Sequence, residues 1–284
     1  MPTLLSRAHH LAVVVCAVHL WAGIAFPAAR TQSTYSILVT NDDGVRAPGI
    51  LALAQALQGV GEVTIVAPSE NQSGKGHSIT ISDPIYVDRV TIGPGLQAYS
   101  AVATPASCVK VALGGIMSRK PDLVVSGINR GYNLGMVTYV SGTVGAAREA
   151  ALTGIPAVAA SLTTDESDYA PAAQIVRQVV ELVKKQGLER GVFLNVNVPR
   201  GTAAAIKGIQ LTRQSALSGV ERFEEQKSPT GRRYFWSVWN EPTGDTEGTD
   251  VWATEHGYAA VTPLKVGEFD PKTYDALRAL VIGK

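Results

Sequence analysis

Short apolar runs that alternate with helical patterns are the feature that most constrains the fold of this chain. The segments 36–40 and 63–67 are apolar and rich in β-branched residues, which is typical of strands covered on both faces. Between them, residues 48–57 place apolar side chains at helical spacing, with Pro48 at the start and Gly59 just after the end. The pattern predicts a strand–helix–strand unit with parallel strands.

The same alternation continues along most of the chain. Further strands are expected near 84–90 and 96–102 and at 122–127, 157–160 and 193–198, with helices at 105–116, 144–152 and 172–183. This order predicts an α/β fold with a doubly wound, mostly parallel, Rossmann-like sheet. From about 209 to 245 strand-like stretches separated by charged segments predict a C-terminal β-hairpin arm. Such an arm favours a homodimer or homotetramer, and a simple surface hairpin is the alternative.

The first thirty residues differ from the rest of the chain. Arg7 provides a short cationic lead, an apolar run spans 11–26, and small residues follow as far as Ala29. The run is shorter than the roughly 20 residues that a membrane span needs, so the order predicts a signal peptide at 1–29. We expect one α/β domain at 30–284, no stable membrane span after cleavage, and a periplasmic or secreted protein. Without a functional signal the protein would be cytoplasmic.

The charge balance limits the partners that the protein can bind. The formal net charge is +1, and charged residues make up 17% of the 284-residue chain. Proteins that bind duplex nucleic acid carry a basic excess, which this sequence lacks. We therefore expect a globular protein that does not bind duplex nucleic acid.

Polar residues follow each of the first core strands, where open parallel sheets bind their ligands. They are Asn41, Asp42 and Asp43 after the first strand, the loop 69–77 after the second, and Asn129 and Asn133 in the loop 126–135. Adjacent carboxylates repel each other in a half-buried crevice unless a cation offsets the repulsion. Asp42 and Asp43 therefore predict a divalent metal ion, with an exposed Asp-Asp-Gly turn as the alternative.

Two further segments have the composition of phosphate-binding sites. The loop 71–78 combines glycines, hydroxyls, Lys75 and His77, as a phosphate-cradling loop or a polar surface loop would. The segment 141–143 precedes a helix, whose N-terminus accepts either a capping side chain or an anion. Glu149 inside that helix is expected to be a salt-bridge partner rather than an acid catalyst.

Several of these segments together carry a family resemblance. They are 37–44, 66–68, Ser73, 78–80, 104–105, 126–129 and 141–150, followed by 249–250 and 261–264. In this order they resemble the SurE family of stationary-phase survival proteins, which are metal-dependent 5'- and 3'-nucleotidases. The resemblance covers nearly all of the chain after the signal-like segment and implies a SurE-like α/β domain with one divalent metal ion per subunit.

The resemblance also implies a set of site residues. Carried over by position, the metal ligands are Asp42, Asp43, Ser73 and Asn129. All four present oxygen, which suits Mg²⁺ or Mn²⁺ and argues against a dedicated zinc site. The sequence departs from many members of the family at 136–140, so we expect the rim of the phosphate pocket to differ.

The implied reaction is hydrolysis of nucleoside 5'-monophosphates, with 3'-monophosphates as a further expected substrate. Asp42 and Asp43 act through the metal ion, and His77 is the candidate proton donor. The candidates for binding or orienting phosphate are Asn41, Lys75, Asn133, Ser141, Gly142 and Thr143.

Three alternatives remain open at this point. A broad-specificity acid phosphatase or an exopolyphosphatase would use the same metal chemistry on other substrates. A mechanism through an aspartyl-phosphate on Asp42 is weakened because the second Asp usually lies two positions on. A non-catalytic protein that binds phosphorylated ligands would use the same loops without turnover.

Overall fold

The computed structural model describes residues 34–281, so the predicted signal peptide at 1–29 lies outside the described residues. The main sheet contains β1 (Ser36–Thr40), β2 (Glu62–Pro68), β3 (Val87–Gly93), β4 (Leu96–Ala101), β5 (Leu123–Arg130), β6 (Ala157–Leu162), β7 (Val192–Val198), β8 (Ile209–Leu211) and β11 (Ala259–Lys265). The helices are α1 (Pro48–Leu57), α2 (Pro105–Val111), α3 (Gly142–Leu152), α4 (Ala170–Gln186), α5 (Asp250–Glu255) and α6 (Pro271–Val281). A π-helical turn, η1 (Ala112–Ile116), and a 3-10 helix, η2 (Gly135–Tyr139), complete the elements around the sheet.

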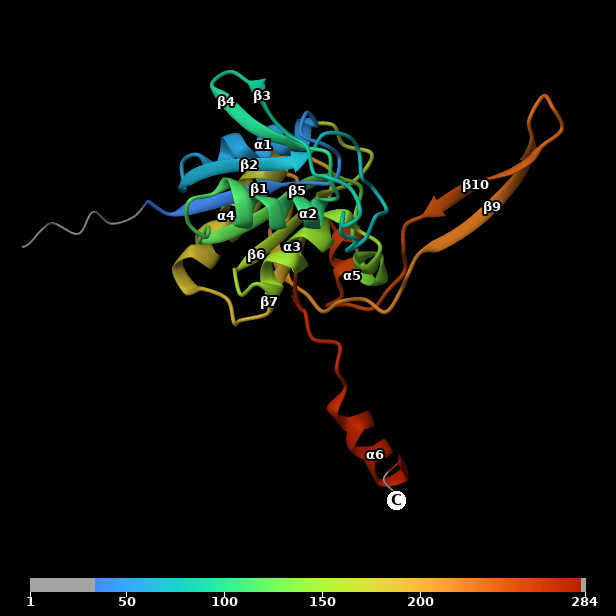
Figure 1. Ribbon diagram of the computed structural model, residues 1–284. Coiled ribbons are helices and arrows are strands. Elements are labelled where there is room, and N and C mark those ends of the chain that lie inside the picture. The colour runs from blue at the N-terminus through green and yellow to red at the C-terminus, as the bar shows by residue number, and fades with distance from the viewer. Residues whose placement is uncertain (1–33, 282–284) are drawn as a thin grey trace, which may run out of the picture. The chain divides into compact units, whose positions relative to one another are not determined.

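The strand order in the sheet is β3-β4-β2-β1-β5-β6-β7-β11-β8 (Figure 1). The pairs from β4 to β7 are parallel, and the antiparallel pairs β3–β4 and β7–β11 lie towards the two sides. This arrangement confirms the predicted α/β fold with a mostly parallel, doubly wound sheet. Strand β1 lies inside the sheet with β2 and β5 as neighbours. Hydrogen bonds on both sides of β1 therefore fix the position of the residues that follow it.

Strand β1 contributes to a separate hydrophobic core on each face of the sheet. Ile37 and Val39 pack in the core that contains α1 and α4, whereas Leu38 packs in the core that contains α2 and α3. Successive side chains of a strand point to opposite faces, so an uninterrupted apolar strand can serve both layers. The two cores fix the register of β1 and with it the position of the residues after Thr40.

The predicted helix at 105–116 forms in two parts. Residues Pro105–Val111 are α-helical, with the Thr104 side chain accepting a hydrogen bond from the Ser107 N–H as its cap. The rest is the π-helical turn η1, which contains Gly114 and Gly115. Glycine has a low helix propensity because it gives up the most backbone freedom, and the α-helical geometry ends before this pair.

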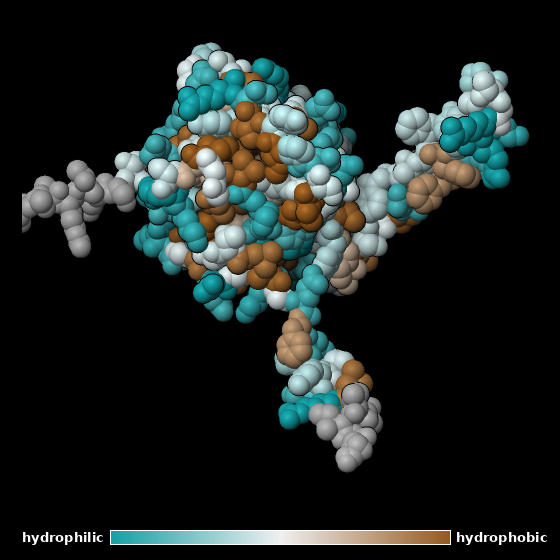
Figure 2. Space-filling view, in the orientation of Figure 1, coloured by the Kyte–Doolittle hydropathy of each residue, from teal (hydrophilic) through white to brown (hydrophobic). Residues whose placement is uncertain are grey.

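The C-terminal region contains the predicted hairpin, formed by β9 (Val220–Lys227) and β10 (Arg233–Asn240) in antiparallel register. Strand β8, at the start of the predicted arm, instead pairs with β11 in the main sheet. Every residue of β9 is exposed, and Figure 2 shows apolar side chains along the hairpin. Within residues 34–281, none of the helices has the length and apolar character needed to cross a membrane.

Candidate functional site

Three loops meet at the carboxyl end of β1. Thr40 at the end of β1 lies opposite Ser126 of β5 in the parallel register, which places the segment after β1 beside the last residues of β5. The Gln72 N–H donates a hydrogen bond of 2.7 Å to the Asp42 carbonyl oxygen, which holds the 71–78 loop against the same segment. The structure therefore brings the neighbourhoods of Asp42, Ser73 and Asn129 together, as the sequence predicts.

The Asp42 carboxylate lies at the N-terminus of α3. The Thr143 hydroxyl donates a hydrogen bond to Asp42 Oδ1, and backbone N–H groups at Gly142 and Thr143 stabilise the same carboxylate. A Cβ on Gly142 would come within 2.8 Å of Asp42 Cβ, so this close approach requires glycine. Burial raises the pKa of Asp42, and the hydrogen bonds from Thr143 and Gly142 oppose that shift. These contacts orient Asp42, and the predicted roles of Gly142 and Thr143 in phosphate binding stay predictions.

Asp43 connects the end of β1 to the end of β5. Its Oδ2 accepts a hydrogen bond of 3.1 Å from the Arg130 N–H, next to Asn129 in the chain. Burial and repulsion by Asp42 raise the pKa of Asp43 to about 6, against the effect of Arg130. Asp42 is buried and Asp43 partly buried, and two such carboxyls with raised pKa values form a site that a cation would stabilise.

The oxygen atoms around this pair fit a divalent metal ion. The Asn129 amide nitrogen donates a hydrogen bond of 2.7 Å to the Gly131 carbonyl oxygen. The other amide atom, Asn129 Oδ1, therefore remains available to a ligand. Within the described residues, the buried oxygens Thr40 Oγ1, Asn41 Oδ1 and Ser126 Oγ at this edge lack hydrogen-bond partners. Carboxylate, amide and hydroxyl oxygens are ligands that Mg²⁺ and Mn²⁺ prefer. Nowhere in residues 34–281 do three or more His, Cys, Asp or Glu side chains gather as a metal cluster.

The 71–78 loop is also fixed to α3. The Gly76 N–H donates 3.0 Å to the Val140 carbonyl oxygen, just before the helix begins. A Cβ on Gly145 would come within 2.4 Å of the Gly76 carbonyl oxygen, so the loop backbone lies directly on the helix. This packing fixes the loop that carries Ser73, although Ser73 itself is exposed.

A three-residue ionic cluster joins this loop, α2 and α3. His77 Nε2 lies 2.8 Å from Glu149 Oε2, and Lys110 Nζ lies 3.2 Å from Glu149 Oε1. The hydrogen bond from His77 and, to a smaller degree, the interaction with Lys110 hold the pKa of Glu149 below its usual value. The prediction that Glu149 is a salt-bridge partner is confirmed.

The remaining predicted phosphate ligands have different surroundings. Ser141 Oγ accepts a hydrogen bond of 3.1 Å from the Val144 N–H, so Ser141 caps α3. The Lys75 side chain is exposed in the loop, and the Asn41 amide donates 2.8 Å to the Gly44 carbonyl oxygen. The roles predicted for these residues in phosphate binding are untested and stay predictions.

Asn133 is held by two asparagines of β7 that the sequence analysis did not identify. The Asn133 backbone N–H donates a hydrogen bond of 2.8 Å to Asn197 Oδ1. The Asn195 side-chain amide donates one of 2.7 Å to the Asn133 carbonyl oxygen. The Asn133 amide nitrogen in turn donates 2.8 Å to Ser161 Oγ. A signal was present in the sequence, because two asparagines in an otherwise apolar buried strand need hydrogen-bond partners. They fix the 131–135 loop behind the site.

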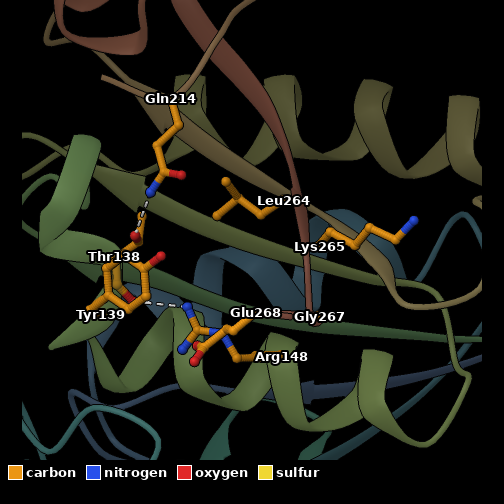
Figure 3. Close-up of a pocket in the computed structure, with 8 residues that line it drawn as sticks. All are labelled: Thr138, Tyr139, Arg148, Gln214, Leu264, Lys265, Gly267 and Glu268. Carbon is orange, nitrogen blue, oxygen red and sulfur yellow. Dashed lines mark hydrogen bonds between the residues drawn. The ribbon is translucent and has the colours of Figure 1, made fainter. Parts of the chain in front are cut away.

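A separate cavity of about 280 Å³ lies between η2, α3 and the end of β11. Figure 3 shows the Arg148 guanidinium beside Tyr139, with Gln214 reaching Thr138 from the opposite wall. The Arg148 guanidinium donates a hydrogen bond of 3.4 Å to the Thr138 carbonyl oxygen and lies 5.6 Å from the Tyr139 ring centre. Burial lowers the pKa of Arg148. The four predicted metal ligands do not line this cavity, so it is distinct from the candidate site.

Comparisons with known proteins agree with this arrangement. Residues 37–220 match the model of the family described as survival protein SurE. A 5'-nucleotidase SurE from Christiangramia forsetii is 44% identical over 234 residues, which cover 81% of this chain and 90% of that protein. A 5'-nucleotidase SurE from Geobacter sulfurreducens is 45% identical over 232 residues, which cover 81% and 87%. The crystal structure of the SurE protein from Aquifex aeolicus aligns with a TM-score of 0.75 at 37% identity, covering 86% of this chain and 99% of that one.

Proposed function

The chain belongs to the SurE family, and on this premise we propose that it is a 5'-nucleotidase that hydrolyses nucleoside monophosphates to nucleosides and phosphate. The observation that carries the proposal is the junction of the Asp42 and Asp43 pair with the N-terminus of α3. A cation at the carboxylates and an anion at a helix N-terminus attract each other, so the two features suit one phosphate group. Both relatives named above are called 5'-nucleotidase SurE.

The SurE family is metal-dependent, and we propose that each subunit holds one Mg²⁺ or Mn²⁺ ion. Its ligands would be Asp42, Asp43, Ser73 and Asn129, whose oxygen atoms match the preference of these ions. When bound, the ion would polarise the phosphoryl oxygens and activate a water molecule for attack.

The chain's own residues would orient the reacting groups. The Thr143 hydroxyl orients Asp42 and favours its ionised form, and the Arg130 N–H does the same for Asp43. The N-terminus of α3 would contribute the positive end of its helix dipole near developing negative charge, and Lys75 is exposed in the 71–78 loop. His77, oriented by Glu149, is the proposed donor of a proton to the leaving alcohol.

The position of Asp42 favours metal-assisted hydrolysis over a covalent aspartyl-phosphate. The adjacent carboxyls of Asp42 and Asp43, both with raised pKa values, would be stabilised by a cation, whereas a phosphoryl group on Asp42 would place further negative charge beside Asp43. Trapping of an acid-stable or borohydride-reducible phosphoenzyme would show the covalent route instead.

The decisive experiment measures phosphate release with AMP, short polyphosphate and p-nitrophenyl phosphate as substrates. Each is tested with Mg²⁺, with Mn²⁺ and after chelation, for the wild type and for Asp42→Asn. The control is Asp88→Asn, which removes an exposed carboxylate from β3. We expect AMP hydrolysis that requires metal, is lost in Asp42→Asn and persists in Asp88→Asn. Full activity of chelated Asp42→Asn would refute the metal mechanism, and preference for polyphosphate would replace the proposed substrate.

The N-terminal segment supports a proposal of export to the periplasm or the exterior. Its cationic lead and apolar run have the order of a secretory signal. Fusion of residues 1–35 to a reporter that is active only outside the cytoplasm tests it, and an inactive reporter with uncleaved fusion protein would contradict export.

The hairpin supports a proposal of a homodimer or homotetramer. Phe223 and Phe235 are 65% and 54% exposed on it, which is unusual for aromatic side chains without a partner surface. Light scattering on the purified protein measures the mass directly, and a monomeric mass at working concentration would overturn the proposal.

A further inference from the structure

A cavity of about 620 Å³ is lined by chain neighbours of the candidate metal and phosphate residues. One wall is formed by Gly74 and Val140, and the facing wall by the root of the hairpin, with Gly219, Glu221 and Trp239. This volume is in the range of about 300 to 1,000 Å³ that is typical of small-molecule sites. The cavity is therefore large enough for a nucleoside.

Two residues that line the cavity are chain neighbours of candidate site residues. Gly74 directly follows Ser73, a proposed metal ligand, and Val140 directly precedes Ser141, the cap of α3. The hydrogen bond of 3.0 Å between the Gly76 N–H and the Val140 carbonyl oxygen joins these two segments. A substrate whose phosphate lies at Ser73 and Ser141 would have the adjoining part of the molecule in this cavity.

The cavity exposes apolar side chains that nothing among the described residues covers. Met136, Val140 and Trp239 are 39%, 54% and 43% exposed, and all three line it. An exposed indole beside a polar site is costly in water and offers a flat surface to a planar ring. The part of a nucleotide that matches such a surface is the base, not the phosphate.

The Trp239 ring is held in place by a close backbone approach. Gly219 has a φ of +69° and lies so near the indole that a Cβ would come within 2.7 Å of the ring. The Met136 N–H donates 2.9 Å to the Leu217 carbonyl oxygen, which joins the root of the hairpin to η2. The stacking surface is thus formed before a ligand arrives, which lowers the entropy cost of binding.

Glu221 gives the cavity a charged group. Its carboxylate accepts a hydrogen bond of 2.6 Å from Ser237 Oγ and can accept others, but it cannot donate while ionised. Hydroxyl or amino groups of a nucleoside match this acceptor, whereas additional phosphate groups would be repelled by its charge. The charge therefore favours a nucleoside monophosphate over a polyphosphate chain.

We propose that this cavity binds the nucleoside part of the substrate, with the base stacked on Trp239 and a hydroxyl or amino group bonded to Glu221. The proposal rests on the proposed function, because it assumes that the phosphate binds at the metal site. It assigns to Trp239 the role of a specificity-determining residue, which separates nucleotides from other phosphate monoesters.

The test compares Trp239→Ala with Trp236→Ala, a matched control on the same strand. Trp236 is 60% exposed and points to the opposite face of β10, because side chains alternate along a strand. Base–aromatic stacking contributes roughly 1–3 kcal/mol, so we expect Trp239→Ala to raise KM for AMP about 5- to 150-fold with little change in kcat. KM for ribose 5-phosphate, which lacks a base, should change less than twofold. Trp239→Phe should restore most of the affinity for AMP, and Trp236→Ala should behave like the wild type.

A second measurement keeps this proposal separate from the proposed activity. Adenosine, which has no phosphate, is titrated against the metal-loaded wild type while tryptophan fluorescence is recorded. Saturable quenching by adenosine that is lost in Trp239→Ala supports the nucleoside site, whether or not any substrate is hydrolysed. Absence of hydrolysis together with such quenching would refute only the nucleotidase function. Equal losses of AMP and ribose 5-phosphate hydrolysis in Trp239→Ala, or unchanged KM values in every variant, would overturn the role of Trp239.

Discussion

Replacement of Asp43 by Asn tests two opposite effects of the Asp43 charge. The charge should lower the stability of the metal-free protein, and it should raise the affinity for a cation. In the metal-free protein the Asp43 carboxylate is partly buried beside Asp42, and both conditions oppose its ionisation. Asparagine has nearly the same size and keeps an oxygen for the Arg130 N–H, but it carries no charge. The substitution should therefore stabilise the metal-free protein at neutral pH while it weakens metal binding.

The magnitude follows from the pKa of Asp43, which is raised from an ordinary value of 3.8 to about 6. Each pKa unit corresponds to about 1.4 kcal/mol, so ionised Asp43 costs about 3 kcal/mol. Because the folded pKa lies above the unfolded one, the folded state binds more protons between these values. Stability of the metal-free wild type should then fall as pH rises from about 4 to 6 and remain lower above pH 6. Asp43→Asn should lack the part of this fall that Asp43 causes, leaving the part from Asp42, and should be about 3 kcal/mol more stable at pH 8.

Urea unfolding followed by far-UV circular dichroism, at pH 4 and pH 8 after chelation, measures these free energies. Asp88→Asn is the control, because an exposed carboxylate should change stability by less than about 0.5 kcal/mol. Addition of Mg²⁺ at about 100 times its Kd should stabilise the wild type by about 2.7 kcal/mol and Asp43→Asn far less. Destabilisation of the metal-free protein by Asp43→Asn at pH 8, or an equal gain from Mg²⁺ in the variant and the wild type, would contradict the cost assigned to the Asp43 charge.

Three further substitutions test contacts around the site. Thr143→Val removes the hydroxyl that orients Asp42 and should raise the Mg²⁺ concentration for half-maximal activity about 10- to 100-fold, with unchanged metal affinity as the contrary result. Gly145→Ala places a Cβ against the Gly76 carbonyl oxygen and should lower kcat/KM for AMP at least tenfold, whereas Gly114→Ala, in open space, should leave kcat/KM unchanged. Glu149→Gln should lower the free energy of unfolding by about 1 kcal/mol at pH 7. Because the Glu149 pKa is lowered, that difference should disappear as pH falls below the lowered pKa in denaturant titrations, and a difference that persists at low pH would contradict an ionic origin.

The positions of the proposed ligands could be predicted because they depend on local patterns. The apolar run of β1 ends at Thr40, and the carboxylates follow at once, so the strand pattern alone places Asp42 and Asp43 at the sheet edge. The same reasoning places Asn129 at the end of β5, and Ser141 before α3 has the residue type and position of a helix cap. Each of these predictions needs only the period of a strand or the chemistry of a helix end.

The contacts that orient these groups could not be predicted in the same way. Thr143 reaches Asp42 across 101 positions, and His77 reaches Glu149 across 72. No local period encodes such pairs, because they depend on how α3 packs against the loop after β2. The position of Trp239 could not be predicted either, because it depends on how the root of the hairpin packs against η2.

The distance in sequence between Asp42 and its partners also determines when the site can form during protein synthesis. A chain is made from its N-terminus, so Asp42 and Asp43 emerge well before β5 and long before Thr143. Until then β1 lacks one of its two neighbours, and the carboxylates lack both the Arg130 N–H and the Thr143 hydroxyl. A nascent chain that ends before α3 therefore has both proposed acidic ligands but lacks the Thr143 hydroxyl that orients Asp42. The proposed metal ion would then stabilise only those molecules whose synthesis has passed the start of α3.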